Sequence, residues 1–240
     1  MYTETIGIVG GFGGFATLDF LRRLLETFAT GHERDYPRIV MDNNFTMPSR
    51  TRALLYDENY EEITYQIVKS IKNLISIGAD KIVLPCGTSH WFLERVYQIA
   101  PEVQDKVVDI IQVTGEKLKS EQIHSCYVIA AEGSMKKKLF DKKLREYGIS
   151  VKSPVEQDWP TVRYFIEATK QNQITPSVKS QFEKFVLERA EREQQGMNHS
   201  LHVILGCTEL PPLVDVNSCT SIKWEDPLEN VLKYLKQNLR

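Results

Sequence analysis

Two short stretches of the sequence place a cysteine where an apolar run ends. In LPCGTSH, Cys86 follows a proline and is followed two positions later by Thr88; in LGCTEL, Cys207 follows a glycine and directly precedes Thr208. A thiol has a reference pKa of about 8.5, so a cysteine can remove a proton from carbon or return one near neutral pH. Two cysteines on opposite sides of one carbon atom could invert its configuration. The pattern therefore predicts an isomerase with Cys86 and Cys207 as acid and base.

The surroundings of the two cysteines suit a substrate that carries a carboxylate. Thr88 and Thr208 offer hydroxyl donors, and the glycine loops of the chain offer free backbone N–H groups. A helix that begins just after each cysteine would lower the pKa of the thiol and favour a bound anion. We expect such helices after both stretches.

The other two cysteines are expected to be structural. Cys126 lies inside an apolar run and Cys219 in a loop rich in Ser and Thr. A free cysteine commonly behaves as a small buried hydrophobic residue. Four cysteines in 240 residues do not form a disulfide framework, and a cytosolic setting would keep them reduced.

The elements that must position the two cysteines follow an alternating pattern. Short apolar runs rich in β-branched residues alternate with segments of helical spacing, which predicts parallel sheets with crossover helices on both faces, an α/β fold. Strands are expected at 5–10, 38–42, 81–85, 107–111, 126–130 and 202–206, and helices at 60–77, 158–170, 177–194 and 226–238, with a further Lys-rich helix that ends at Tyr147.

The sequence contains an internal repeat of these patterns. Gly13 and Gly133 each lie in a glycine loop after a strand, and they are about 120 positions apart, as are Cys86 and Cys207. Two pairs that share one offset indicate a duplication. We therefore predict two pseudo-symmetric lobes, each a parallel sheet flanked by helices, with the active site in the cleft between them.

The boundaries of the two lobes are predicted from the same repeat. Lobe 1 is expected to comprise residues 1–113 plus 214–240 and to carry Cys86, whereas lobe 2 comprises 114–213 and carries Cys207. The Pro-Pro pair of ELPPLV would form the second connection. Sites of α/β proteins lie beyond the carboxyl ends of the strands, so the two cysteines would face each other there.

Composition excludes several classes of partner. The chain has 30 basic and 32 acidic residues, so nothing indicates a nucleic-acid partner. Its apolar runs are far shorter than the roughly 20 residues that a membrane span needs. The N-terminal segment enters IGIVGG almost directly, so no secretory signal is expected and the protein is predicted to be cytoplasmic.

Five motifs together resemble those of the cofactor-independent aspartate/glutamate racemases, over nearly the whole chain: IGIVGGFGG, PSRT, GADKIVLPCGTSH, IAAEGSM and ILGCTELPPLV. The resemblance implies a racemase of aspartate and/or glutamate that needs neither pyridoxal phosphate nor a metal and uses a cysteine pair. GCTEL points to the aspartate racemase branch. The resemblance also implies a homodimer whose ligand is a small amino acid, dicarboxylic by preference.

The resemblance assigns the α-carboxylate to one group of residues. Thr88 and Thr208 would bind it, and we expect Ser134 and the backbone of Gly13 and Gly14 to help seat it.

The remaining site residues have other expected roles, of which the resemblance implies that of Arg50. Arg50 of PSRT would read the distal carboxylate, for which a planar guanidinium is well suited. Glu209 would contact the substrate ammonium or assist Cys207, or it would be a carboxylate stabilised at a helix N-terminus. The family motifs PCNT and PDRT read PCGT and PSRT here, so Gly87 and Ser49 remove polar groups from the pocket. A racemase of another amino acid, or a carboxylate-binding homologue without turnover, is therefore the alternative.

A dinucleotide-binding enzyme is a further alternative. GFGGFA after the first strand fits G-x-G-x-x-A, and Asp42 ends the next strand. This fingerprint explains neither the second glycine loop nor the cysteine pair.

Histidines near the cysteines allow two weaker readings. Cys86 and His90 could form a nucleophile–base pair, or they could join Cys207, His199 and His202 in a metal cluster. No tight C-x-x-C or H-x-x-x-H unit supports a metal.

Two charged features remain. Arg163 would reach the cleft as a second cation or lie on a solvated helix face, and the run MKKKLFDKKLRE is expected to form a solvated helix face.

Overall fold

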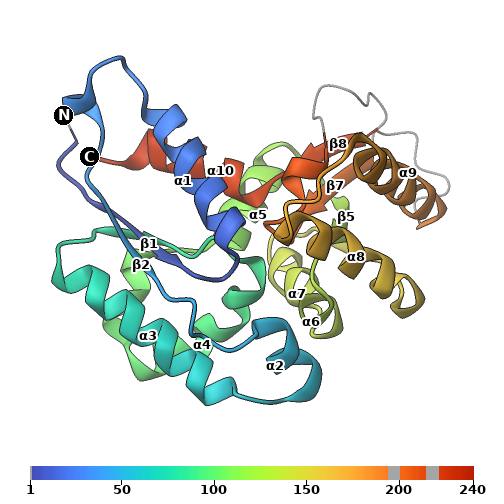
Figure 1. Ribbon diagram of the computed structural model, residues 1–240, viewed down its shortest axis with the longest axis horizontal. Coiled ribbons are helices and arrows are strands. Elements are labelled where there is room, and N and C mark those ends of the chain that lie inside the picture. Colours follow the sequence, from blue (N-terminus) through green and yellow to red (C-terminus); the bar gives the residue numbers. More distant parts are fainter. Residues whose placement is uncertain (1, 194–200, 215–221) are drawn as a thin grey trace.

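The computed structural model describes residues 2–193, 201–214 and 222–240 (Figure 1). His199 and Cys219, which the sequence analysis considered, lie outside these residues. The described residues contain two parallel sheets of four strands, with the orders β2-β1-β3-β4 and β6-β5-β7-β8. The strands are β1 (Ile6–Gly10), β2 (Ile39–Asn43), β3 (Lys81–Val83), β4 (Val107–Val108), β5 (Ser125–Ile129), β6 (Ser150–Lys152), β7 (Leu201–Leu205) and β8 (Ile222–Glu225).

The two sheets have the same topology, because β1 to β4 correspond in order to β5 to β8. In each sheet the first strand of the chain pairs in parallel with the second and the third, and the third pairs with the fourth. The predicted α/β fold with two pseudo-symmetric sheets flanked by helices is confirmed.

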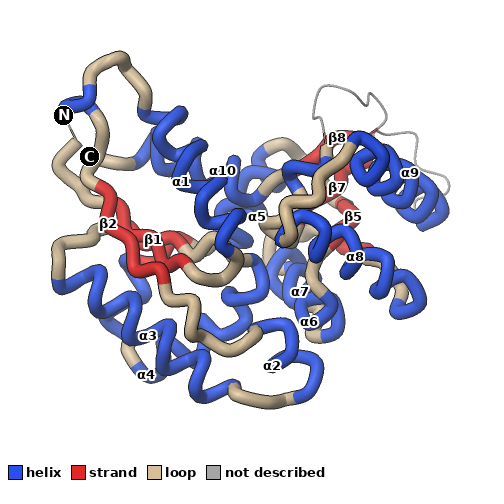
Figure 2. Tube along the Cα trace, viewed as in Figure 1, coloured by secondary structure: helices blue, strands red, loops and turns tan. Residues whose placement is uncertain are grey.

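Helices flank both sheets (Figure 2). They are α1 (Gly14–Phe28), α2 (Arg50–Tyr56), α3 (Tyr60–Ser76), α4 (Leu93–Ile99), α5 (Ile110–Ser120), α6 (Glu132–Lys136), α7 (Leu139–Arg145), α8 (Trp159–Lys170), α9 (Pro176–Glu193) and α10 (Pro227–Asn238). Among the described helices, none is long and apolar enough to cross a membrane.

The first strand of the first sheet and the third strand of the second sheet are short and fully buried. Every residue of β1 and β7 is buried, which explains why their sequences are almost continuously apolar. A two-sided hydrophobic strand of this kind packs helices on both faces, and α1 and α3 lie on opposite sides of β1 in Figure 1. β3 pairs in parallel with β1 and is buried except at Lys81, so the loops at the carboxyl ends of β3 and β7 both follow well-packed strands.

The predicted lobe boundaries need two corrections. β8 pairs with β7, with Val203 opposite Trp224, so residues 222–225 belong to the second sheet and not to the first lobe. The predicted boundary at residue 113 falls inside α5, a continuous helix that packs against α10. The chain returns to the second sheet before α10 because β8 covers the edge of β7 and buries Trp224 there.

The Lys-rich run is not one solvated helix. It divides into α6 and α7 at Lys138, whose φ of 54° lies in the left-handed region. Four of its lysines contact the first half of the chain: Lys136 donates to the Leu55 carbonyl, Lys137 pairs with Asp57, Lys142 lies over the Trp91 ring and Lys143 pairs with Asp109. The run therefore fastens one half of the molecule to the other.

Candidate active site

One cavity of about 330 Å³ brings most of the predicted site residues together. Its wall includes Arg50, Cys86, Gly87, Thr88, Cys207, Thr208 and Glu209. These residues come from the loops after β3 and β7 and from the start of α2, so both sheets contribute to the wall. Gly13, Gly14 and Ser134 do not line this cavity.

The backbone takes a different form after each of the two cysteines. After Cys86 the chain forms a 3₁₀ helix over Gly87–Phe92, and after Cys207 it forms a turn followed by a short 3₁₀ segment, Pro211–Leu213. The expected helix is therefore present directly after Cys86, as a 3₁₀ helix, and absent directly after Cys207, where the chain turns. The electrostatic environment of Cys207 is set by a side chain instead.

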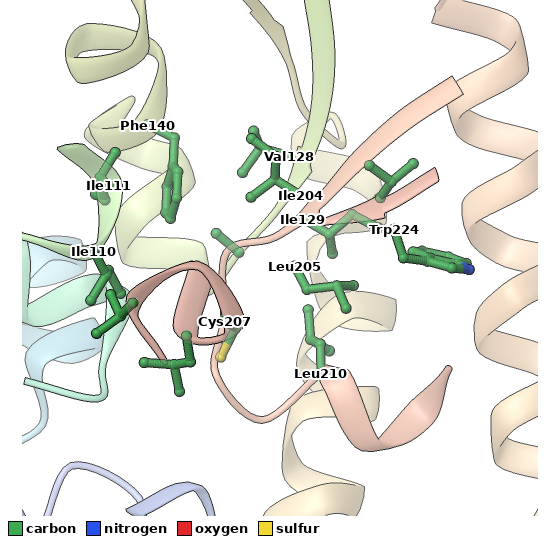
Figure 3. Close-up of a cluster of buried hydrophobic side chains, with 14 of the residues drawn as sticks. Ile110, Ile111, Val128, Ile129, Phe140, Ile204, Leu205, Cys207, Leu210 and Trp224 are labelled. Carbon is green, nitrogen blue, oxygen red and sulfur yellow. The ribbon is translucent and has the colours of Figure 1, made fainter. Parts of the chain in front are cut away.

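Cys207 has a carboxylate as its immediate neighbour. Its Sγ donates a hydrogen bond to Oε2 of Glu209 at 2.9 Å, and the cysteine lies at the edge of the buried hydrophobic cluster shown in Figure 3. Burial, followed by the negative charge of Glu209 and this hydrogen bond, raises the pKa of the Cys207 thiol well above its ordinary value. Cys207 is therefore a thiol at neutral pH, the form that can give a proton.

Gly13 supports this pair from behind the cavity wall. A Cβ atom at Gly13 would overlap with Oε1 of Glu209, so the first glycine loop leaves the space that the carboxylate occupies. The predicted assistance of Cys207 by Glu209 matches this contact, whereas Glu209 lies in a turn and not at a helix N-terminus.

The two threonines form hydrogen bonds that join the halves of the molecule. The Thr208 hydroxyl donates to the Pro85 carbonyl at 3.0 Å, and the Ser134 hydroxyl donates to Thr88 Oγ1 at 3.0 Å. Ser134 therefore lies behind Thr88 and orients it. Gly87 is equally constrained, because a Cβ atom there would overlap with the carbonyl oxygen of Gly206. The Asn that the family motif carries at this position does not fit between the two loops in this arrangement.

Arg50 is held against the loops but keeps unused donors. Its Nη1 donates to the Pro48 carbonyl at 2.9 Å, and its Nη2 donates to the Phe12 carbonyl at 2.6 Å. The guanidinium also lies 4.9 Å from the centre of the Phe12 ring. Its Nε is buried and has no hydrogen-bond partner. Leaving a buried donor unpaired costs about 1–3 kcal/mol, so this edge of the guanidinium suits an acceptor from a ligand.

Ser49 caps α2 by accepting from the Arg52 N–H at 3.3 Å, so it supports the helix and not Arg50.

Two ion pairs on the cavity wall were not found from the sequence as pairs. Lys170 lies 2.8 Å from Glu167, one turn away on α8, and Arg163 Nε lies 3.0 Å from Glu132 on α6. Burial lowers the pKa of Lys170, but the hydrogen bond to Glu167 and the negative charge of Glu209 outweigh it and raise the pKa overall. Arg163 therefore lies on the cavity wall, which agrees with the prediction that it reaches the cleft, but its charge is already paired with Glu132. The three-residue spacing of Glu167 and Lys170 could have predicted this ion pair from the sequence. It could not have shown that this side of the helix faces the cavity.

Cys126 is fully buried in β5, and burial raises its pKa to about 12, so this thiol is inert near neutral pH. Among the described residues, no group of three or more His, Cys, Asp and Glu side chains is arranged to hold a metal ion.

Comparison with known proteins places this geometry in a family. The model of the Asp/Glu/hydantoin racemase family matches residues 9–227. A broad-specificity amino-acid racemase, RacX of Bacillus subtilis, is 23% identical over 218 residues, which cover 88% of this chain and 87% of that protein.

Solved structures agree with this match. The aspartate racemase of Picrophilus torridus is 27% identical with a TM-score of 0.78, and the alignment covers 99% of this chain and 96% of that one. The glutamate racemase of Francisella tularensis, solved with D-glutamate, is 18% identical, has a TM-score of 0.69 and aligns over 98% of this chain and 80% of that one, which shows the shared fold. Because the family model covers most of its length, the chain belongs to the Asp/Glu/hydantoin racemase family, and the predicted isomerase of the amino-acid racemase type is confirmed.

Proposed function

We propose that the protein racemises an amino acid with an acidic side chain, aspartate by preference, by proton transfer between Cys86 and Cys207. The observation that carries this proposal is the presence of both thiols on the wall of one cavity built from the two halves of the fold. The reaction exchanges one proton for another at Cα, so it needs neither an oxidant nor a group-transfer cofactor.

The proposed step is balanced at each atom. The thiolate of one cysteine takes the Cα proton, and the electron pair of the broken C–H bond delocalises into the substrate α-carboxylate. The thiol of the other cysteine then gives its proton to the opposite face of Cα. Since burial and Glu209 favour the protonated form of Cys207, Cys86 would be the base in this protonation state. The reverse reaction uses the same two residues with their roles exchanged.

Carboxylate recognition would use donors on opposite sides of the cavity. Thr88 and Thr208 border the thiols, and the resemblance implies that they bind the α-carboxylate. The Thr88 hydroxyl accepts from Ser134 and keeps its own hydrogen for the α-carboxylate, whereas the Thr208 hydroxyl would have to release the Pro85 carbonyl to donate to it. Arg50 would bind the distal carboxylate through its unpaired Nε and the remaining N–H of Nη2, a planar pair of donors. Lys170 adds a further cation to the wall.

One feature of the cavity wall argues against a strict preference for dicarboxylic amino acids. Arg163 and Lys170 are each paired with a glutamate, so part of the positive charge of the wall is neutralised. A pocket with few unpaired cations would admit other amino acids, and the RacX relative of Bacillus subtilis is a broad-specificity amino-acid racemase. A homodimeric assembly stays a prediction from the resemblance, and a cytoplasmic location stays a prediction from the sequence.

Loss of the α-proton signal in D₂O tests the proposal directly. We would follow both enantiomers of aspartate, glutamate, alanine and lysine by proton NMR, with polarimetry to record racemisation. Wild type should exchange and racemise aspartate, and Cys86→Ala and Cys207→Ala should each abolish racemisation. Cys126→Ala, which removes a thiol outside the cavity, should racemise like wild type. Racemisation that survives in Cys207→Ala, or no exchange with any of the amino acids, would disprove the two-cysteine mechanism.

The role of Arg50 has its own test. Arg50→Lys keeps the charge but loses the planar pair of donors. The KM for aspartate should rise at least about tenfold, the effect of losing a charge-assisted hydrogen bond, whereas turnover of alanine should be unchanged. An equal loss for both amino acids would mean that Arg50 only braces the loops of Phe12 and Pro48.

A further inference from the structure

His90 is a buried histidine beside the site that the proposed chemistry does not use. It lies four residues after Cys86 on the 3₁₀ helix and is 1% exposed. The structure does not support the nucleophile–base reading, because the ring nitrogen Nδ1 lies 2.9 Å from the carbonyl oxygen of Cys86 and no hydrogen bond joins the ring to the thiol. On the other side of the ring, the backbone N–H of Ile110 donates to Nε2 at 3.2 Å.

These two contacts determine the tautomer of the ring. A backbone N–H can only donate, so Nε2 accepts and carries no proton. The proton is then on Nδ1, which donates to the carbonyl of Cys86. Burial lowers the pKa of His90, which keeps the ring neutral. Asp109 lies 3.9 Å from Nε2, beyond hydrogen-bond reach of the ring, and its carboxylate accepts instead from the α5 backbone and from Lys143. His90 is therefore a neutral bridge between two backbone segments.

The bridge ends on the peptide that carries the catalytic thiol. The Cys86 carbonyl accepts from His90 Nδ1, from the Ser89 hydroxyl at 2.7 Å and from the Ser89 N–H at 3.2 Å. Three donors on one carbonyl restrict the rotation of this peptide. His90 is the member of the set that reaches another element, because it also binds the first residue of α5.

We infer that His90 is a positioning residue that holds the Cys86 thiol in place relative to the cavity by fixing its peptide to the start of α5. This inference rests on the proposed two-cysteine function. Cys207 is held differently, because Glu209 contacts its sulfur directly. Loss of the His90 bridge should therefore impair proton transfer at Cys86 and leave proton transfer at Cys207 unchanged.

Single-cysteine backgrounds separate the two thiols. In Cys207→Ala only Cys86 can remove the α-proton and return a deuteron to the same face, and in Cys86→Ala only Cys207 can do so. Exchange in D₂O therefore reports one thiol at a time, each with one enantiomer of aspartate as substrate. His90 variants placed in both backgrounds show which thiol depends on the histidine.

Asn and Gln form a matched pair of substitutions at this position. The Asn amide nitrogen takes the place of Nδ1 and can still donate to the Cys86 carbonyl, whereas the Gln amide oxygen takes the place of Nε2 and can still accept from Ile110. In the Cys207→Ala background, His90→Gln should slow exchange about tenfold and His90→Asn less than about threefold, as expected for loss or retention of one buried hydrogen bond. In the Cys86→Ala background, both should stay within about twofold of the parent.

Thermal unfolding of the four double variants completes the test. Both substitutions remove one of two buried hydrogen bonds, so similar melting temperatures are expected for Asn and Gln. Equal slowing in both cysteine backgrounds, or equal slowing by Asn and Gln, would overturn the positioning role and leave His90 as a structural residue. No exchange in either unsubstituted background would instead refute the two-cysteine function and this inference with it.

Discussion

Glu209→Gln is the substitution that most directly tests the environment of Cys207. Glu209 accepts a hydrogen bond from the thiol at 2.9 Å and contributes negative charge that raises the thiol pKa. Glutamine keeps an oxygen that can accept the same hydrogen bond but removes the charge. The pKa of Cys207 should fall, and a larger fraction of the residue should be thiolate at a given pH.

The expected size follows from the charge and its distance. Two unit charges about 4 Å apart interact by about 4 kcal/mol at an effective dielectric constant of about 20. Because water at the cavity screens the pair and the carboxylate spreads its charge over two oxygens, we expect about a third of this to survive, which corresponds to roughly ten times more thiolate. A thiolate of lower pKa is a weaker nucleophile, with a Brønsted slope of about 0.4–0.5, so the net gain in alkylation rate is about threefold.

Iodoacetamide alkylation read by peptide mass spectrometry measures this for each cysteine separately. At pH 7.5 the rate at Cys207 should rise about threefold in Glu209→Gln, while Cys86 in the same sample should keep its wild-type rate. Cys126 is fully buried and should not react in the folded protein. The pH at which racemisation reaches half its maximum should also move lower.

Two further variants make the result specific. Gly13→Ala should act in the same direction, because the added methyl group would displace the Glu209 carboxylate from its place beside the thiol. Glu167→Gln removes the same charge from the cavity wall at a residue that pairs with Lys170, and it should change the Cys207 rate less than Glu209→Gln does. An unchanged or slower reaction of Cys207 in folded Glu209→Gln protein would refute the assigned cause of the raised pKa.

Three further predictions concern stability. Gly87→Ala should lower the free energy of unfolding by about 1–3 kcal/mol in urea denaturation, because its methyl group would overlap with the rigid carbonyl of Gly206. Lys143→Ala should cost about 1–3 kcal/mol in the same assay, because it leaves the nearly buried Asp109 carboxylate without its cation, and the lysine is partly exposed to screening water. Burial raises the pKa of Cys126 from 9.0 to about 12, so the folded protein keeps this thiol protonated over a pH range in which the unfolded chain loses the proton. The free energy of unfolding should therefore fall as the pH rises from about 9 to 12. Cys126→Ala should show a smaller fall over the same range.

The fold could be predicted where burial alone determines the pattern. β1, β5 and β7 are internal strands with apolar residues on both faces, and the sequence shows them as uninterrupted runs. β6 and β8 were not predicted. Both are short edge strands. In β6 only the middle residue, Val151, is partly buried, and the residues on either side of it are exposed, so its sequence resembles a loop. Its pairing with β5 depends on the neighbouring strand and not on its own composition.

The site was predictable to the extent that it follows strand ends. Cys86 and Cys207 each follow the third strand of a sheet, and equivalent strand ends in two similar sheets can face one cavity. Lys170 could not be placed in this way, because a helix presents every third or fourth residue to the same side and only packing decides which side faces the cavity. Ser134 was predicted to touch the substrate but lies behind Thr88, since a hydroxyl on the opposite loop intervenes.

The pseudo-symmetry of the backbone does not extend to the chemistry of the two thiols. Cys207 has a carboxylate at its sulfur, whereas Cys86 has its carbonyl bound by His90. In the proposed mechanism this asymmetry cannot favour one enantiomer in kcat/KM, because the equilibrium constant between enantiomers is unity and fixes that ratio for wild type and variants alike. It can act only on kcat and KM separately. The enantiomer that presents its α-proton to Cys86 binds the favoured enzyme form, in which Cys207 is protonated. The other enantiomer must bind the less populated form, in which Cys86 is protonated and Cys207 is the thiolate. Substitutions at Glu209 should therefore change KM and kcat unequally for the two enantiomers while their ratio kcat/KM stays equal.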